Sequence, residues 1–376
     1  MFINIFFNRV SGLKNNRIPV LVFVLFIIAL IVVKFVFIDI VYIGQQYEKN
    51  RIMTSSGEKF KSGNLSVDYS IDQTLQDIES LQLNTVNVPI IIDIPSLTSN
   101  TMRINAESEK KAIKLIRMLR YRGINVILEP YPYIQNGEKY ETALLPDNVD
   151  LWFTNWKAVL QELIHDVAKP NKVYAICIGS NFEKFEDRTD YWTDVADFVR
   201  QEFQGKMTYR TNWWYTAVWN TDNDPQNDTY TPKLNNPIFG KVDFISVAAY
   251  FELSDKETNT VENLISAIYK TKIYNREQNI YSELKSLSGK WNKPIFFGEL
   301  GFPKRNGAAT HPWNPIPTDI MNGQEQANCF EAYRRVFTPE PWHMGFSVFA
   351  IGKIDSEKNY YPSFQSAEII RKWYIE

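Results

Sequence analysis

The sequence predicts an α/β fold, a (β/α)8 or TIM barrel, preceded by one N-terminal transmembrane helix. From residue 63 onward, short apolar runs alternate with amphipathic segments, and this alternation occurs eight times in about 310 residues. Such alternation indicates parallel strands joined by right-handed helical crossovers. No glycine-rich phosphate-binding fingerprint follows any of these runs, which argues against an open nucleotide-binding sheet. Eight units in a chain of this length therefore favour a closed barrel.

The most apolar stretch of the chain lies before the barrel, at Ile18–Gly44, and its first part, Ile18–Val33, carries no charge. About 20 apolar residues are needed to span a bilayer. Basic residues precede the stretch, so the short N-terminus is expected in the cytoplasm. A cleaved signal peptide is the alternative, but the run is long for one, and no A-x-A-like site follows closely. The basic residues are Arg9, Lys14 and Arg17.

These observations divide the chain into four predicted parts. The anchor is expected to remain uncleaved, so that the barrel lies outside the cytoplasm at the cell membrane. The polar segment after it has no hydrophobic period and is typical of a tether. The predicted parts are a cytoplasmic N-terminus at 1–17, a transmembrane anchor at 18–43, a linker at 44–62 and the barrel at 63–376.

Composition excludes several functional classes. The chain has 376 residues and a formal net charge of −2, and it contains no long basic run, which argues against a nucleic-acid partner. Three His and two Cys argue against a zinc site or a disulfide framework, so no metal and no cofactor is predicted. Cys177 lies in a strand pattern and Cys329 in a helical one, which favours small core residues over a disulfide.

The predicted strands are short apolar runs rich in Val, Ile and Phe. The third run is followed by Pro130 and Pro132, which are expected to end it because proline cannot donate to a sheet. The seventh is a buried run that ends directly before Glu299. The predicted strands are Gly63–Val67, Thr85–Ile94, Ile124–Glu129, Val173–Gly179, Lys206–Arg210, Val242–Ala249, Pro294–Gly298 and Met344–Ala350.

The predicted helices carry apolar residues three and four positions apart, as in Ile71, Leu75 and Ile78. Gly123 and Gly205 are expected to stop two of them. Thr221–Asn236 is polar and contains several Asp, Asn and Pro, so it is predicted to be a long loop. The predicted helices are Ile71–Leu81, Ala106–Tyr121, Asp147–Val167, Asp190–Phe203, Val261–Leu287 in two pieces, Gly323–Phe337 and Ser363–Tyr374.

Four carboxylates follow predicted strands, at the end of a barrel where catalytic groups lie. Glu299 stands out, because a Gly-Phe-Pro turn and a loop with His311 and Trp313 follow it. An acid among aromatic residues at the open end of a barrel is typical of enzymes that act on sugars. A carboxylate that only caps the next element or pairs with a nearby Arg is the alternative interpretation of Glu299. The other three are Glu129 and Glu252, for which surface charge is the favoured interpretation, and Glu183, for which both interpretations stay open.

Several segments, taken in order, resemble glycoside hydrolase family 113. The most specific is Lys293–Phe302 with Asn306–Trp313, and the others are Tyr174–Ser180, Tyr209–Trp213 and Val242–Tyr250. The resemblance covers roughly residues 60 to 374. It implies a retaining β-mannanase on a (β/α)8 barrel, with Glu299 as the nucleophile and with Asn212, Trp213 and Tyr250 lining the sugar site. A carboxyl separation of about 5–5.5 Å would fit retention, and a wider one inversion.

The chain departs from the family pattern in two places. The family's fourth strand ends in a Glu that acts as the acid/base, and the matching residue here is Asn181. An amide cannot protonate a leaving oxygen, and losing that help costs about 10²–10⁴-fold in rate. The family's eighth strand tends to end in Trp, whereas this chain has Phe346–Ala350, which predicts a weakened or moved stacking platform.

Two functional hypotheses follow. The first is a membrane-anchored extracytoplasmic glycosidase that acts on a polysaccharide or oligosaccharide, with Glu299 as nucleophile and Glu183 as substitute acid/base. The second is an impaired barrel that binds a cell-surface or exported polysaccharide without cutting it. A purely structural anchor is disfavoured, because a scaffold needs no aromatic mouth. The predicted substrate-binding residues are Asn181, Asn212, Trp213, Tyr250, Trp313 and Glu129, with Trp214 as a further stacking candidate.

Overall fold

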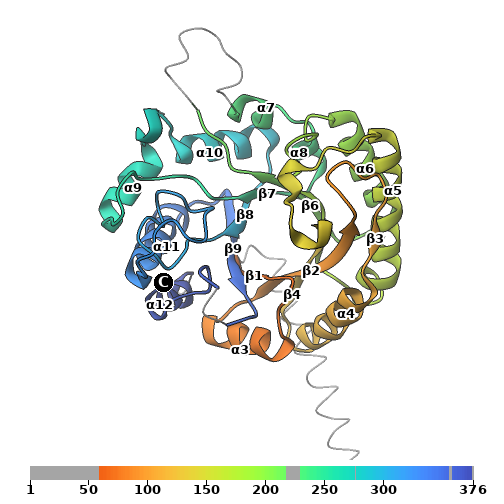
Figure 1. Ribbon diagram of the computed structural model, residues 1–376, viewed down its shortest axis with the longest axis horizontal. Helices are drawn as coiled ribbons and strands as arrows, with labels where there is room; N and C mark the ends of the chain where they lie inside the picture. The colour runs from red at the N-terminus through yellow and green to blue at the C-terminus, as the bar shows by residue number, and fades with distance from the viewer. Residues whose placement is uncertain (1–58, 217–228, 276, 355–357, 375–376) are drawn as a thin grey trace, which may run out of the picture. The chain divides into compact units, whose positions relative to one another are not determined.

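Eight parallel strands form a closed ring in the computed structural model of the chain, which describes residues 59–216, 229–275, 277–354 and 358–374 (Figure 1). Strand β1 closes the ring, because it pairs in parallel with β2 on one side and with β9 on the other. A short strand, β3, is antiparallel to β2 and lies outside the ring. The strands are β1 Phe60–Leu65, β2 Thr85–Ile94, β3 Arg103–Ile104, β4 Asn125–Ile134, β5 Ala175–Ser180, β6 Lys206–Asn212, β7 Phe244–Ala248, β8 Ile295–Leu300 and β9 His343–Ile351.

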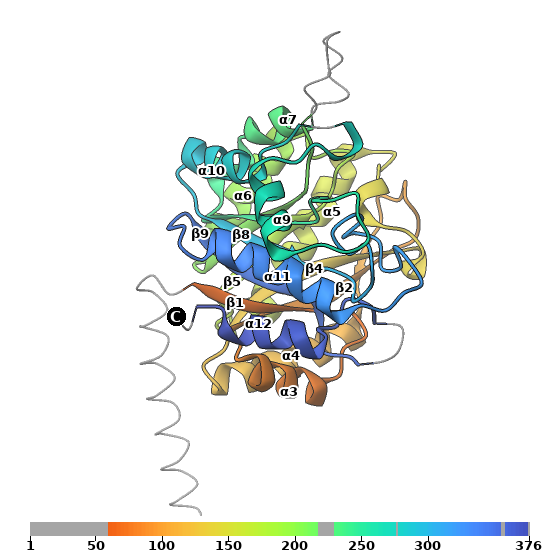
Figure 2. The same cartoon turned by 90° about the vertical axis from the view of Figure 1, so that its left-hand side faces the viewer.

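Helices surround the strands, as the predicted TIM barrel requires (Figure 1). Many begin at a polar residue whose side chain accepts a backbone N–H; Ser70, for example, accepts from Gln73. Figure 2 shows α11 beside β8 and β9, with α12 between α11 and α3. The helices are α3 Ile71–Leu81, α4 Ala106–Tyr121, α5 Val149–Glu162, α6 Thr189–Glu202, α7 Tyr230–Leu234, α8 Ile238–Lys241, α9 Val261–Tyr269, α10 Ile280–Trp291, α11 Gly323–Phe337 and α12 Phe364–Lys372.

Strand β4 continues through both prolines, so the prediction that they end it was wrong. The Val126 carbonyl accepts from Tyr174 N, which precedes β5, so even-numbered residues of β4 face β5. The pairing between β4 and β5 stops at Leu128. Pro130 and Pro132 therefore face a side without a ladder partner, where a missing N–H costs nothing.

Three further boundaries differ from the prediction. Strand β1 begins at Phe60, inside the predicted linker. The long helix ends in a π-helical segment, Leu163–Ala168, after α5. The predicted loop 221–236 contains helix α7 in its described part. Short helices such as α7 leave no amphipathic period long enough to be detected in the sequence.

The predicted anchor at 18–43 lies outside the described residues, as do the predicted cytoplasmic segment and most of the linker. Within the part of the chain that the structure describes, no helix has the length and apolar character that crossing a membrane requires.

The barrel interior is filled at the N-terminal ends of the strands by a buried cluster of side chains. Phe60 packs edge-on against Phe244 and Phe296, with ring centroids 6.3 and 5.8 Å apart. Ile127 and Ala175 complete the cluster. This apolar plug leaves the opposite, C-terminal ends of the strands for polar side chains. Cys177 and Cys329 are both buried and unbonded, which confirms them as core residues.

Candidate active site

Glu299 lies in β8 with its carboxylate at the C-terminal end of the barrel, as predicted. Ala248 of β7 is its partner in the sheet, and Ala249 N donates to its carbonyl at 2.7 Å. The Tyr250 hydroxyl donates to Oε2 at 3.1 Å, and Arg210 Nη1 donates to Oε1 at 2.6 Å. The Glu299 side chain is 14% exposed, so the carboxylate is oriented by two donors and still reaches solvent.

Arg210 of β6 joins two carboxylates inside the barrel. Its Nη2 forms an ion pair with Glu129 Oε1, and Asn87 Nδ2 donates to the same oxygen at 2.7 Å. Glu129 is 5% exposed, so its interpretation as a surface charge was wrong. The single Arg210 cation serves both Glu129 and Glu299, which leaves this group of three with a net negative charge.

Gly298 makes room for the arginine. A Cβ at this position would lie 2.9 Å from Arg210 Nε and still closer to Ser246 Oγ. Real Cβ atoms essentially never approach so closely. Arg210 is buried, and its two terminal nitrogens are paired with Glu129 and Glu299, so it cannot move away. The glycine directly before Glu299 is therefore a requirement of the charged cluster, and a close approach of this kind is a common reason for glycine in a strand.

Asn181 follows β5 at the position where the resemblance expects a carboxylic acid. Its backbone has a φ of 54°, in the left-handed region that Asn tolerates better than most residues. Its N–H donates to the Arg210 carbonyl at 2.9 Å, and its side-chain Nδ2 donates to Glu141 Oε1 at 3.1 Å. The side-chain oxygen of Asn181 is buried without a hydrogen-bond partner. Asn181 therefore points its amide at a carboxylate from another part of the chain.

That carboxylate, Glu141, belongs to a short 3-10 turn, Glu141–Ala143, in the connection between β4 and α5. Burial, with a smaller effect of the negative charges of Glu299 and Glu183, raises the pKa of Glu141 to about 7, although the Asn181 hydrogen bond acts in the opposite direction. The sequence prediction missed Glu141, because it lies in a polar connection with no hydrophobic period. The only indirect signal was the missing carboxylate at position 181.

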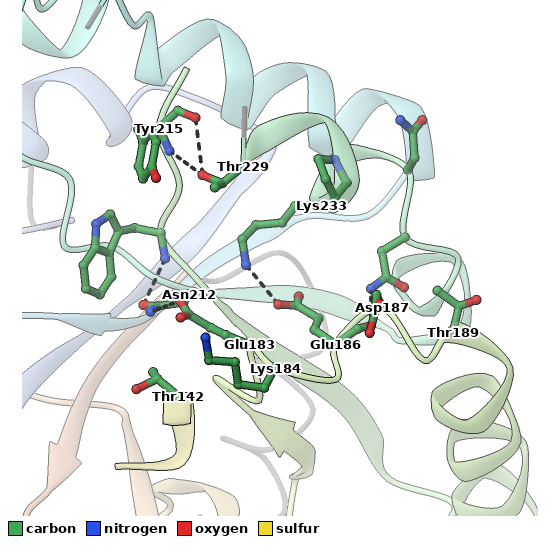
Figure 3. A pocket seen from close by; sticks show the side chains of 14 residues that line it. Thr142, Glu183, Lys184, Glu186, Asp187, Thr189, Asn212, Tyr215, Thr229 and Lys233 are labelled. Carbon is green, nitrogen blue, oxygen red and sulfur yellow. Dashed lines mark hydrogen bonds and ion pairs between the residues drawn. The ribbon is translucent and has the colours of Figure 1, made fainter. Parts of the chain in front are cut away.

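Glu183 lies on the loop after β5 and lines a cavity of about 770 Å³ (Figure 3). Its Oε1 accepts from Asn212 Nδ2 at 2.5 Å. Lys184, Thr142 and Trp213 also line this cavity. Farther along the wall, Lys233 donates to Glu186 Oε2 at 2.9 Å. Most of the residues that line the cavity are polar or charged, so they can form hydrogen bonds with the hydroxyl groups of a ligand.

The aromatic residues of the predicted sugar site fall into three groups. Tyr250 and Trp213 meet edge to face with ring centroids 5.7 Å apart, beside Glu299 and the cavity. Trp313 is 45% exposed, and its Nε1 donates to Glu252 Oε1 at 3.2 Å. Trp214 is only 1% exposed and stacks on Tyr230, so its prediction as a sugar platform was wrong.

Two of the carboxylates in this site, Glu299 and Glu141, have contrasting environments. Glu299 has a cation beside it, whereas the side chain that contacts Glu141 is a neutral amide. Pairs of acids whose environments differ in this way are what acid–base chemistry on a sugar uses. No group of His, Cys, Asp and Glu within the described ranges could hold a metal ion.

A barrel with two carboxylic acids of contrasting environment near the C-terminal ends of its strands is the arrangement that glycoside hydrolases of this fold use. The model of Glycoside Hydrolase Family 113 matches residues 59–362, and the chain belongs to this family. No curated protein matches the chain.

Solved structures with the same fold include a GH113 beta-1,4-mannanase complex, at TM-score 0.63 and 18% identity, covering 84% of this chain and 99% of that one. The GH113 beta-mannanase AaManA from Alicyclobacillus acidocaldarius, in complex with ManMIm, has TM-score 0.64 and 16% identity, with 84% and 96% covered. A beta-glucuronidase from an uncultured Clostridium sp. has TM-score 0.53 and 16% identity, with 84% of this chain and 50% of that chain covered. These likenesses show the barrel fold.

Proposed function

We propose that this protein is a retaining glycoside hydrolase that cleaves a β-linked, mannan-like polysaccharide. Glu299 attacks the anomeric carbon in this proposal, with Arg210 and Tyr250 holding its two oxygens. Membership of family 113 and the likeness to solved structures of GH113 beta-mannanases support the substrate class. The observation that carries the proposal is the position of the Glu299 carboxylate, partly exposed at the C-terminal end of β8 beside Tyr250.

Release of reducing ends from soluble β-1,4-mannan tests this function. Glu299→Gln keeps the shape of the side chain and can still accept from Tyr250, but it removes the nucleophile. We expect this variant to lose all measurable hydrolysis, because a neutral amide cannot form the covalent intermediate. Glu368→Gln, at a half-exposed position of α12, is the control and should cleave like the wild type. Full activity of Glu299→Gln would refute the role of this carboxylate.

The second candidate function is binding of a polysaccharide without cleavage. Asn181 favours it, because an amide stands at the position where the family carries its acid/base. A protein of this kind would be retarded by mannan in affinity electrophoresis yet release no reducing ends under any condition. Cleavage of any β-linked glycan by the wild type would exclude this alternative.

We further propose that residues 18–43 anchor the chain in the cell membrane, with the barrel outside the cytoplasm. The apolar run and the basic residues before it support this arrangement. The full chain should stay in the membrane fraction after alkaline carbonate extraction, while protease added to intact cells should release the barrel. Protection of the barrel in intact cells would contradict the orientation.

A further inference from the structure

The missing acid at Asn181 raises the question of which group protonates the leaving sugar. A retaining glycosidase needs a second carboxyl group besides its nucleophile, close to the same sugar ring. Two candidates lie near the C-terminal ends of the strands, Glu183 and Glu141, and they come from different connections of the barrel.

Resting on the hydrolase function proposed above, we propose that Glu141 is the catalytic acid/base, supplied by the connection after β4 in place of the residue at position 181. Asn181 Nδ2 donates to Glu141 Oε1 at 3.1 Å. A carboxylate oxygen therefore lies one hydrogen bond away from the side chain that occupies the family's acid/base position. The amide of Asn181 orients this carboxyl group, which makes Asn181 a positioning residue.

The surroundings of Glu141 fit this role. Glu299 of β8 lies near enough for its charge to act on Glu141, and Tyr131 of β4 is influenced by both carboxylates. Thr142, the next residue, lines the cavity together with Glu183 and Asn212 (Figure 3). The turn that carries Glu141 therefore lies beside both the proposed nucleophile, Glu299, and the cavity. A residue that acts on a bound glycan must lie in such a position.

Glu141 also has the protonation behaviour that a general acid requires. Burial raises its pKa to about 7, and the charges of Glu299 and Glu183 act in the same direction. Further titratable groups on this side are Tyr131, Tyr133, Tyr140 and Tyr360, and Arg210 faces Glu299 from β6. A carboxyl group with a pKa near the working pH can give up a proton and take it back, as acid/base catalysis requires.

The reaction balances with these two carboxyl groups and water alone. Glu299 forms a bond to the anomeric carbon while the bond to the glycosidic oxygen breaks, and the Glu141 proton passes to that oxygen. Water then attacks the anomeric carbon and gives its proton to the Glu141 carboxylate. The bond to Glu299 breaks, which restores both groups and releases the sugar with its original configuration.

Glu183 fits less well. Its carboxylate accepts a 2.5 Å hydrogen bond from Asn212 and lines the cavity, whereas Glu141 is the carboxylate that contacts Asn181. The left-handed turn at Asn181 separates Glu183 from the strand end, and Glu183 N donates to the Asn181 carbonyl at 2.9 Å. In this arrangement Glu183 belongs to the cavity wall.

The test compares Glu141→Gln, Glu141→Ala and Glu183→Gln in the full chain, on β-1,4-mannan and on a dinitrophenyl β-mannobioside. Dinitrophenolate leaves without a proton, so only the mannan needs the acid. In Glu141→Gln the side-chain oxygen can still accept from Asn181, so this contact of the fold is kept. Glu138→Gln is the matched control, because Glu138 is exposed, lies three residues earlier and accepts a hydrogen bond from the exposed Gln135.

We expect Glu141→Gln to lose about 10²–10⁴-fold in kcat/KM on mannan, to keep formation of the glycosyl-enzyme from the dinitrophenyl substrate, and to lose the fall of activity above pH 7. Azide should accelerate turnover of the dinitrophenyl substrate by Glu141→Ala and give a mannosyl azide of retained configuration. Glu138→Gln should match the wild type in every measurement.

The inference is overturned if Glu141→Gln cleaves mannan with an unchanged pH profile, or if azide accelerates a further variant, Glu183→Ala, and not Glu141→Ala. A wild-type chain that cleaves neither substrate would overturn the hydrolase function itself, and this inference with it. Wild-type activity in the same assay therefore separates the two failures.

Discussion

Arg210 is the residue on which the charged interior of the barrel depends. It is 3% exposed and forms ion pairs with Glu129 and Glu299, while its Nε has no hydrogen-bond partner. A buried ion pair contributes little net stability when it forms, but removing one partner leaves a buried charge without compensation. The arginine is therefore needed both to fold the site and to hold the proposed nucleophile.

Arg210→Met should lower the free energy of unfolding by about 3–5 kcal/mol at pH 7. Chemical denaturation at pH 7 measures the effect. Lys241→Met is the control, since Lys241 pairs with Asp197 at the surface, and it should cost less than about 1 kcal/mol. Equal losses in the two variants would contradict the argument.

Glu141 gives a second prediction, this time on stability. Its folded pKa of about 7 exceeds the ordinary value of 4.5, so between these two pH values the native state holds a proton that the unfolded chain has released. Wild-type stability therefore falls as the pH rises through this window, whereas a Gln at 141 does not titrate. Allowing for partial exposure, Glu141→Gln should gain about 1–3 kcal/mol at pH 8 and little at pH 4.

Thermal unfolding of Glu141→Gln and wild type across this pH range would measure the difference. The exposed Glu138→Gln serves again as the control and should show no pH-dependent gain. A gain that is the same at pH 4 and pH 8 would mean that the charge of Glu141 is not its cause.

The contrast between Glu299 and Glu141 shows which site residues a sequence can reveal. Glu299 was found because it ends a buried apolar run, and the end of a parallel strand fixes where a side chain lies. Glu141 has no such context, and its contact with Asn181 spans 40 residues of sequence. Trp214 was misassigned because an aromatic residue at a strand end looks the same whether it faces a cavity or the core.

At the scale of the elements, helices α5 and α6 hold the loop that presents Asn181 and Glu183. Phe182 lies between these two residues and is fully buried. Its ring stacks on Trp192 of α6 at 5.5 Å and meets Trp152 of α5 edge-on at 5.2 Å. An aromatic cluster of this kind fixes the loop through its middle residue, so that its polar neighbours face the barrel mouth.

Phe182→Ala should therefore cost about 3–5 kcal/mol in stability through the cavity it leaves. It should also weaken catalysis, because the loop that orients Asn181 loses its anchor. Differential scanning calorimetry and mannan hydrolysis would test both effects. Phe364→Ala, at a position that is 78% exposed, is the control and should stay within about 0.5 kcal/mol of the wild type. Full activity of Phe182→Ala in its folded form would contradict the anchoring role.

The elements with the clearest hydrophobic period were predicted with their observed bounds, among them α3, α4, α11 and β2. Amphipathic spacing and capping residues determine such elements locally, so the sequence is sufficient. The extent of β4 could not be predicted in this way. Whether a proline ends a strand depends on where the neighbouring strand diverges, and that is a property of the assembled sheet.

At the scale of the whole barrel, the ring is completed by its first and last strands. Phe60 and Gly345 are partners in the pairing of β1 with β9, and a Cβ at Gly345 would lie 2.6 Å from Phe60 N. Lys61 adds further contacts, with its N–H donating to Asn84 and its Nζ to the Arg371 carbonyl at 2.6 Å. The eight strand-and-helix units of the sequence predicted this closed ring. The residue at which β1 begins could be identified only from the pairing of β1 with β9 in the structure.

Two shortened chains would test where the folding unit begins. A chain without residues 1–57 keeps all of β1 and should unfold in one cooperative transition, followed by circular dichroism. A chain without residues 1–65 lacks β1, so the facing edges of β2 and β9 are left unpaired. Open strand edges invite association with other chains, so this second variant should aggregate or lose its cooperative transition. If it stayed monomeric with an unchanged melting temperature, closure of the ring by β1 would not be what holds the barrel together.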